Sequence, residues 1–255
     1  MEDKTEKKSL KDRMKGSLDT IKTTAKNVKV PEIKIPEIKK PEVKLSQVKE
    51  LFKKKDPEDH DEEVQNDGIL QIASIATRDA LKIVYYLMAV DGEFTAEEKE
   101  KYEILGKEIS PDFDEQKEKV IAECQTQLEK VIDPEDYYDV LQDGVEDALI
   151  ASMNTEGTYI TPKILVWDLL TLAYSDNDYD EAERRLLKYI VRKTNVDKAV
   201  FLEMESTMKT LIDLEKEQQW IKTTDRPYLT IEAIVNGIED RKQVIFRSVE
   251  DMLAL

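Results

Sequence analysis

From residue 64 onward, apolar residues recur every three or four positions, the spacing that places them on one face of an α-helix. The segments 68–90 and 163–174 are apolar on nearly every side over part of their length, which is typical of buried central helices. Other segments are amphipathic, and their apolar faces comprise Val120, Ile121, Cys124, Leu128 and Val131; Tyr137, Val140, Leu141, Val145, Ala148 and Leu149; Leu186, Leu187, Ile190 and Val191; Val200, Phe201, Met204, Met208, Leu211 and Ile212; and Ile231, Ile234, Val235, Ile238, Ile245, Val249 and Met252. No segment alternates as a strand does, so the sequence predicts an all-α fold, a compact helical bundle.

The first 28 residues predict a basic amphipathic arm outside this bundle. A narrow apolar stripe runs along residues 8–28, and lysines fill much of the remaining surface. Residues 1–55 hold 17 Lys and Arg against 9 Asp and Glu. A helix of this kind can lie on an anionic membrane, so residues 7–29 are a candidate membrane contact. The stripe has no Trp or Phe. The alternatives to membrane contact are a helix that docks on a protein partner, a helix that docks on itself, and a segment without a fixed fold.

A five-residue unit is repeated three times in "VPEIKIPEIKKPEVK", with Pro31, Pro36 and Pro41. Proline at this spacing excludes a helix and favours an extended rod, which reaches about 45 Å over 15 residues at ~3.1 Å each. The repeat is interpreted as a spacer. The alternative is a ligand whose apolar residues enter successive pockets of a partner. The resulting domains are 1–28, the arm; 29–63, the repeat and a charged linker; 64–217, the helical domain; and 218–255, a C-terminal helical extension.

Charge and composition narrow the functional classes. The whole chain has a net charge of −17, so residues 56–255 carry a strong negative charge that disfavours nucleic acid and favours cations or basic protein partners. The single cysteine, Cys124, is on an apolar face and fits packing in a reducing compartment. There is no secretory signal pattern and no run of about 20 apolar residues. We therefore expect a cytoplasmic protein, peripheral at the membrane if the arm binds there.

Two stretches of the predicted bundle share an acidic pattern 85 positions apart, "DGEFTAEE" and "DNDYDEAE". The aligned pairs are Asp91 and Asp176, Gly92 and Asn177, Glu93 and Asp178, Phe94 and Tyr179, Thr95 and Asp180, and Glu98 and Glu183. The similarity extends into the next helix, with Tyr102 against Leu187 and Leu105 against Ile190. Each stretch follows an apolar helix, so the pattern predicts a duplicated helix–turn–helix unit.

Helix termination and capping explain part of each turn. The second residue, glycine in one turn and asparagine in the other, is of a type that tolerates the left-handed conformation ending a helix. Thr95 and Asp180 are expected to cap the next helix, each with a glutamate three residues on to complete a capping box. The aromatic residue before each cap is placed to begin a hydrophobic staple, but the matching positions hold Lys99 and Arg184.

The remaining carboxylates make the turns a candidate metal site, because hard cations prefer carboxylate oxygens. An EF-hand is excluded, since Glu181 stands where its glycine is required and Leu187 where its bidentate glutamate is required. Any ion site is therefore assembled differently, for example by bringing the two turns together. The candidate ligands are Asp91, Glu93, Glu98, Asp176, Asp178, Asp180 and Glu183, and the candidate cofactor is a divalent cation such as Ca²⁺.

The segments "AVDGEFTAEEKEKYEILGKEI" and "AYSDNDYDEAERRLLKYIVRKTNVD" resemble the two signature segments of the TerB-like (tellurite resistance protein B) domain family. The resemblance spans roughly residues 66–215, although the second copy departs in Asn177, Asp178 and Asp180. It implies a compact helical bundle with internal pseudo-symmetry and an acidic, calcium-type site at Asp91, Glu98, Asp176 and Glu183. It also implies a role in tellurite or other stress resistance, with partners at the membrane.

The sequence thus predicts a non-enzymatic module that binds a divalent cation and protein partners, a membrane protein among the candidate partners. The alternative is a structural adaptor whose acidic turns are only helix caps. An enzyme is disfavoured because the chain has one histidine and no glycine-rich phosphate loop, nucleophile elbow or His-Cys metal spacing.

Overall fold

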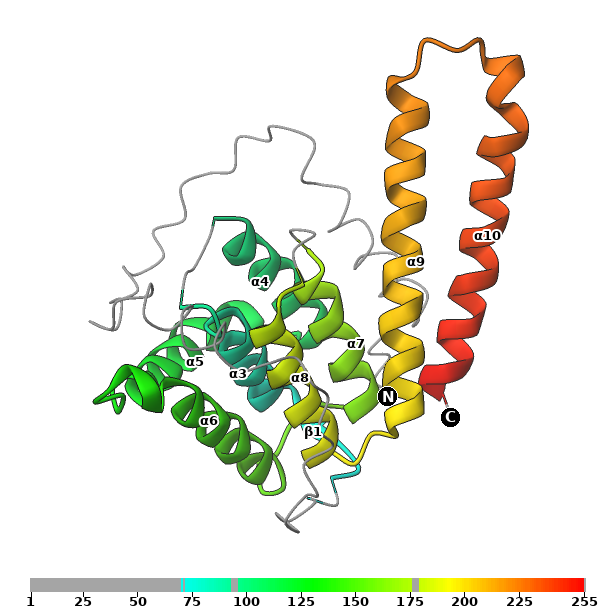
Figure 1. Cartoon of the computed structure of the whole chain (residues 1–255). Coiled ribbons are helices and arrows are strands. Elements are labelled where there is room, and N and C mark those ends of the chain that lie inside the picture. The colour runs from blue at the N-terminus through cyan, green and yellow to red at the C-terminus, as the bar shows by residue number, and fades with distance from the viewer. Residues whose placement is uncertain (1–69, 71, 93–95, 176–178, 255) are drawn as a thin grey trace.

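The computed structural model describes residue 70 and residues 72–92, 96–175 and 179–254, without the side chains of 96–98. Most of these residues are helical (Figure 1), which confirms the predicted all-α bundle. The predicted arm and proline repeat, and the centres of both acidic turns, lie outside the described residues. Within the described part of the chain, no helix has the length and apolar character needed to cross a membrane.

One helix, α3 (Thr77–Met88), forms the centre of the bundle, as the apolar segment 68–90 predicts. Ten of its twelve residues are buried. It packs against α4 (Ala96–Ile109), α5 (Phe113–Leu128), α6 (Tyr137–Ser152), α7 (Pro162–Ala173) and α8 (Glu181–Lys193). A short 3₁₀ helix, η2 (Pro134–Asp136), begins with a proline and separates α5 from α6. The one cysteine, Cys124, lies fully buried in this core, and burial raises the pKa of its thiol to about 12.

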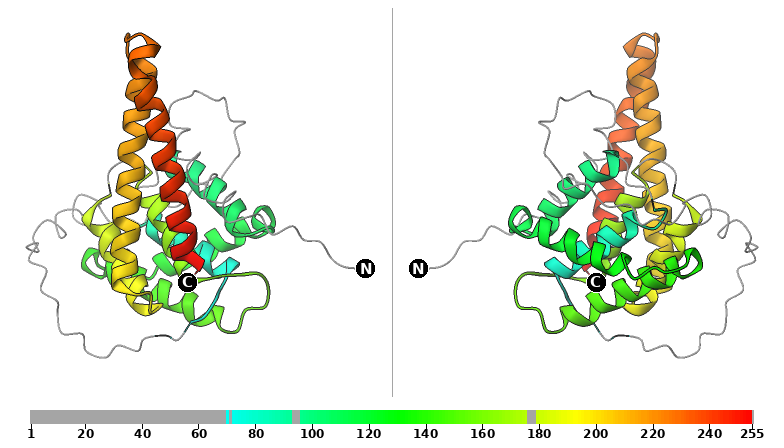
Figure 2. Two further views of the ribbon diagram at one scale, coloured as in Figure 1. Left: turned by 90° about the vertical axis from the view of Figure 1, so that its right-hand side faces the viewer. Right: turned by 90° about the vertical axis from the view of Figure 1, so that its left-hand side faces the viewer.

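The last two helices form a long hairpin that extends beyond the bundle (Figures 1 and 2). They are α9 (Lys198–Thr223) and α10 (Tyr228–Ala254), and the predicted boundary between residues 217 and 218 falls inside α9. Lys242 of α10 is 5% exposed and donates to Glu215 at 2.5 Å and Gln218 at 2.8 Å, so a partly buried ion pair joins the two helices. The last turns of α10 return to the main core through Val249, Met252 and Leu253.

A two-stranded ribbon, which the sequence does not predict, joins the starts of two helices. Its strands are β1 (Ile75–Ala76) and β2 (Tyr159–Ile160), and they pair in antiparallel register with Ile75 opposite Ile160. The strand β1 leads directly into α3, and β2 leads through Thr161 into α7. Strands of two residues are too short to show the alternating pattern by which strands are recognised in a sequence.

The helix boundaries confirm the duplicated unit. The starts of α3 and α7, of α4 and α8, and of α5 and α9 are each 85 positions apart, namely Thr77 and Pro162, Ala96 and Glu181, and Phe113 and Lys198. Ile75 and Ile160 have the same separation and face each other in the ribbon, as residues on a two-fold axis do. The packing follows this pseudo-symmetry, because α4 contacts α7 while α8 contacts α3. The helix after each turn therefore lies against the helix before the other turn.

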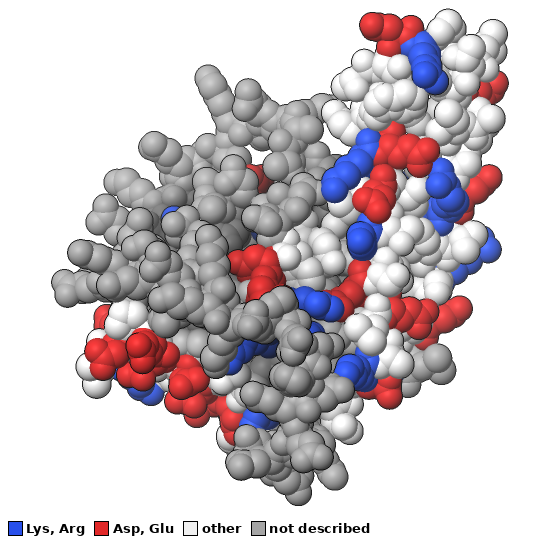
Figure 3. Space-filling view, in the orientation of Figure 1, with Lys and Arg blue, Asp and Glu red and all other residues white. Residues whose placement is uncertain are grey.

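The surface charge differs between the bundle and the hairpin. On the face shown in Figure 3, acidic side chains gather near the α5–α6 end of the bundle, whereas the hairpin carries both signs. The segment between α5 and α6 exposes Glu129, Asp133, Glu135 and Asp136, and beside them the side chain of Ile132 is 86% exposed. This segment therefore presents four carboxylates and one cation, Lys130, near an exposed apolar residue.

Candidate functional site

The first acidic turn begins where α3 ends, and its glycine has the predicted left-handed conformation. Gly92 has a φ of 74°, and its N–H donates to the carbonyl oxygen of Ala89 at 2.8 Å. The hydroxyl of Tyr137, from the start of α6, donates to the same carbonyl oxygen. A residue distant in sequence therefore fixes the backbone at the start of the turn.

Asp91 lies half-buried near this tyrosine. Burial, followed by the negative charge of Asp91, raises the pKa of the Tyr137 hydroxyl above its ordinary value. The carboxylate of Asp91 thus lies close enough to influence the hydroxyl that fixes the turn. It places one negative charge at the edge of the bundle, where the first turn leaves the core.

The second acidic turn enters α8 through the predicted capping box. Asp180 Oδ1 accepts from the Glu183 N–H at 2.8 Å, and Glu183 Oε2 accepts from the Asp180 N–H at 3.0 Å. Two backbone N–H groups at the start of the helix are thereby satisfied. The structure brings these two carboxylates together, and capping accounts for one oxygen of each.

A polar cluster connects the second turn to α9. It consists of Tyr174, Tyr179, Arg184 and Glu205. The rings of Tyr174 and Tyr179 have their centroids 4.6 Å apart, and the hydroxyl of Tyr179 donates to Glu205 Oε1 at 3.0 Å. Arg184 donates to both oxygens of Glu205, from Nε at 3.1 Å and from Nη2 at 3.4 Å. Arg184 thus forms an ion pair at the position where a hydrophobic staple would need an apolar residue.

Burial and contact with Glu205 together shift the pKa values in this cluster. Glu205 is 8% exposed. Burial and the adjacent Glu205 carboxylate raise the pKa of the Tyr179 hydroxyl, while the hydrogen bond to Glu205 raises the pKa of Arg184. The tyrosine therefore stays protonated and the arginine charged at neutral pH. A signal for Glu205 is present in the sequence, since it interrupts the apolar stripe of Phe201, Met204 and Met208 on α9.

The structure describes three of the seven predicted ligand side chains, those of Asp91, Asp180 and Glu183. Glu93, Asp176 and Asp178 lie outside the described residues, as does the side chain of Glu98. Among the side chains that are described, no group of three or more His, Cys, Asp and Glu is arranged to hold a metal ion. The predicted site, with four of its members outside this set, stays a prediction.

Comparisons with known proteins give no relative for this chain. No family model matches it, and no curated protein or solved structure does so. The resemblance to the TerB-like domain therefore rests on the two acidic segments and stays a prediction.

Proposed function

We propose that this chain is a non-enzymatic binding module whose two acidic turns hold a divalent cation, with Ca²⁺ as the candidate ion, and whose helical body docks on protein partners. The observation that carries the proposal is the pseudo-two-fold repeat. Corresponding helices begin 85 positions apart, so each acidic turn stands at the same place in its half. The helix that follows each turn packs against the helix that precedes the other turn, α4 on α7 and α8 on α3. This packing supports a site to which both turns contribute.

The chemistry of the turns is compatible with this role. An ionised carboxylate offers two oxygens with about four lone-pair sites, so an oxygen that caps a helix leaves acceptor capacity for an ion. Asp180 uses Oδ1 for the cap of α8. Asp91 adds a negative charge at the other turn, and the sequence supplies further carboxylates between these positions and the next helices. Oxygen ligands of this kind suit calcium better than softer metals.

The acidic surface around Ile132 supports the second half of the proposal. Its exposed carboxylates attract a basic partner, and the exposed isoleucine offers an apolar contact. The TerB-like resemblance suggests a tellurite-type stress response as the physiological setting, and the basic arm at residues 7–29 suggests a membrane surface nearby. These parts of the proposal rest on the sequence alone.

A structural adaptor without an ion role is the second candidate, and the capping box favours it. Asp180 and Glu183 each satisfy a backbone N–H of α8. A helix cap alone is enough to favour these residue types. A substitution that removes the charge of a turn residue but keeps the helix cap separates the two candidates. It weakens cation binding if the turns hold an ion, and it has no effect on the response to calcium if they are only caps.

Asp180→Ser separates the candidates, because serine caps a helix about as well as aspartate but carries no charge. We expect 10 mM CaCl₂ to raise the melting temperature of the unmodified chain by about 4 °C, since a Kd near 1 mM gives about 1.4 kcal/mol of stabilisation. Asp180→Ser is expected to melt like the unmodified chain without calcium and to lose about half or more of the calcium shift.

Asp240→Ser, at an exposed position of α10, is the matched control and is expected to keep the full shift. An equal melting temperature with calcium and with a chelator, in the unmodified chain and in both variants, overturns the cation role. It leaves the adaptor as the function.

A further inference from the structure

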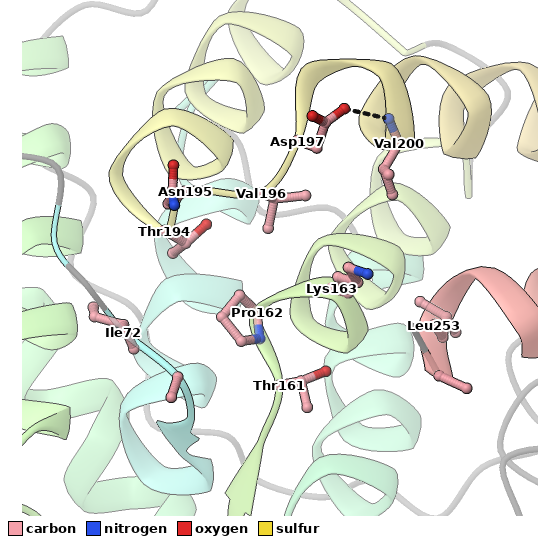
Figure 4. A pocket seen from close by; sticks show the side chains of 12 residues that line it. Ile72, Thr161, Pro162, Lys163, Thr194, Asn195, Val196, Asp197, Val200 and Leu253 are labelled. Atoms are coloured by element: carbon pink, nitrogen blue, oxygen red, sulfur yellow. Dashed lines mark hydrogen bonds between the residues drawn. The ribbon is translucent and has the colours of Figure 1, made fainter.

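A pocket of about 700 Å³ opens at the start of α7. The second acidic turn follows the other end of the same helix. Four separate segments surround it (Figure 4): the residues before β1, the start of α7, the turn between α8 and α9, and the last turn of α10. The volume is in the range of pockets that hold a small ligand. It is an open groove, so an extended chain segment can enter from the side.

The lining of this groove combines an apolar floor with one charge of each sign. Ile72, Pro162, Val196 and Leu253 contribute apolar side chains, and Val200 is a partly buried neighbour. Lys163 and Asp197 also line it. Asp197 uses Oδ1 to accept from the N–H groups of Ala199 and Val200 at 2.7 and 3.2 Å, so its carboxylate is held at the start of α9.

The N-terminal part of the chain joins the bundle beside the groove. The N–H of Leu70 donates to the carbonyl oxygen of Lys193 at 3.1 Å, immediately before the turn that lines one side. Ile72, two residues further on, is already part of the lining. The described chain therefore begins close to the groove, and the sequence of the 69 residues before Leu70 includes the proline repeat at 30–44.

We propose that this groove is the docking site for one unit of the chain's own proline repeat, Pro-Glu-Ile-Lys or Pro-Glu-Val-Lys. The apolar residue of the bound unit, Ile33, Ile38 or Val43, enters the floor. The flanking glutamate lies toward Lys163 and the flanking lysine toward Asp197, so both charges of the unit find a partner of opposite sign. Proline restricts the free segment to extended conformations, which lowers the entropy lost on docking.

The length of the connection makes this contact favourable. Val43 is 27 residues from Leu70, and a flexible chain of that length spans about 30 Å on average. A tethered segment of this reach has an effective concentration on the order of millimolar, so a weak contact suffices for occupancy. Three equivalent units raise the ratio of docked to undocked chain about threefold over one unit, which gives the repeat a role beyond that of a spacer.

Hydrogen–deuterium exchange on the full chain tests the proposal. We compare the unmodified protein with a variant that carries Ile33→Asp, Ile38→Asp and Val43→Asp. Docking covers the groove, so amides of residues 72–76 and 194–200 are expected to exchange at least threefold faster in the variant. A matched control places the same three charges in the arm, as Leu10→Asp, Met14→Asp and Leu18→Asp, and is expected to leave these rates unchanged.

A change on the groove side provides the reciprocal test. Val200→Asp adds a carboxylate to the groove in the first turn of α9, where the helix dipole tolerates an acidic residue. Amides of residues 30–45 are expected to exchange at least threefold faster in this variant, while circular dichroism shows an unchanged helix content. Equal exchange in the unmodified chain and both variants overturns the proposal. Protection that disappears on dilution from 100 to 1 μM also overturns it, because the occupant is then a second copy.

Discussion

The two acidic turns have the same place in the repeat but are held by different contacts. The first turn leaves α3 through a left-handed glycine, and a hydroxyl from α6 binds the carbonyl of Ala89 beside it. The second turn enters α8 through a complete capping box, and Tyr179 with Arg184 binds the buried Glu205 of α9. The helix starts thus have the same spacing in both halves, whereas the side-chain contacts that anchor the two turns are different.

This difference separates two physical requirements. The start and end of a helix depend on a few local residues, and a duplicated segment keeps them as long as the same turn is needed. An anchor depends on which helix lies nearby. The first half is followed by α6, which packs against α3 and α5, whereas the second half is followed by α10, which packs along α9. The neighbours differ, so the anchors differ.

The largest expected effect comes from removing the anchor of the second turn. Glu205→Ala leaves Arg184 and the hydroxyl of Tyr179 without their acceptor. Water screens the partly exposed arginine, so we expect a loss of about 2 kcal/mol in the free energy of unfolding. Glu205→Gln keeps an acceptor for the tyrosine and is expected to lose less. Glu203→Ala, at an exposed position of the same helix, is the control for urea unfolding. Equal stability of the Glu205 and Glu203 variants contradicts the anchoring role.

At the first turn, the conformation of the backbone is the main requirement. Gly92→Ala forces a side chain into a left-handed conformation at φ 74° and is expected to cost about 1.5 kcal/mol. Gly237→Ala is the matched control, because a Cβ there meets no atom within 4 Å and the position lies inside α10. The control is expected to stabilise the chain by up to about 1 kcal/mol. Thermal unfolding of both variants measures the difference, and effects of the same sign contradict this interpretation.

The anchoring tyrosines predict a loss of stability at alkaline pH. The pKa values of Tyr137 and Tyr179 are raised in the folded protein, so their contribution is complete below the unfolded pKa of about 10 and declines as the pH rises above it. Each accounts for on the order of 1 kcal/mol at pH 11. Tyr179→Phe is expected to reduce the drop in stability between pH 9 and pH 11 by that amount.

The exposed Tyr228 provides the control for this pH series, since Tyr228→Phe is expected to leave the drop unchanged. A comparison of Tyr137→Phe with Tyr179→Phe also sharpens the contrast between the turns. Both variants lose a hydrogen bond at neutral pH. Tyr137→Phe leaves the Ala89 carbonyl with the Gly92 N–H as its donor, whereas Tyr179→Phe leaves Glu205 with Arg184. Identical pH profiles for Tyr179→Phe and Tyr228→Phe are the result that contradicts the account.

The smallest effect is expected from the cap of the second turn. Asp180→Ala removes an acceptor for the Glu183 N–H and is expected to lower the free energy of unfolding by about 1 kcal/mol. Asp180→Asn retains a good cap and is expected to stay within about 0.5 kcal/mol of the unmodified chain. Urea unfolding distinguishes the two variants, and an equal loss in both shows that the charge rather than the cap matters for stability.

The sequence predicts those parts of this molecule that depend on local pattern. The apolar periodicity predicts the helices, the offset of 85 predicts the corresponding starts, and the residue types at Gly92 and Asp180 predict a left-handed end and a capping box. It does not predict the β-ribbon, because strands of two residues are too short to show an alternating apolar and polar pattern. It also does not predict the partners of Arg184 and Tyr137, since these lie 21 and 48 positions away and are brought near only by helix packing.

The number of calcium ions bound per chain tests the central claim most directly, namely that the two equivalent turns contribute to one site. Isothermal titration of the full chain with CaCl₂ is expected to give one ion, and Asp91→Asn or Asp176→Asn is each expected to weaken binding at least tenfold by removing a carboxylate from one turn. Two independent ions, each sensitive to only one of the substitutions, or no binding at all, would contradict a shared site.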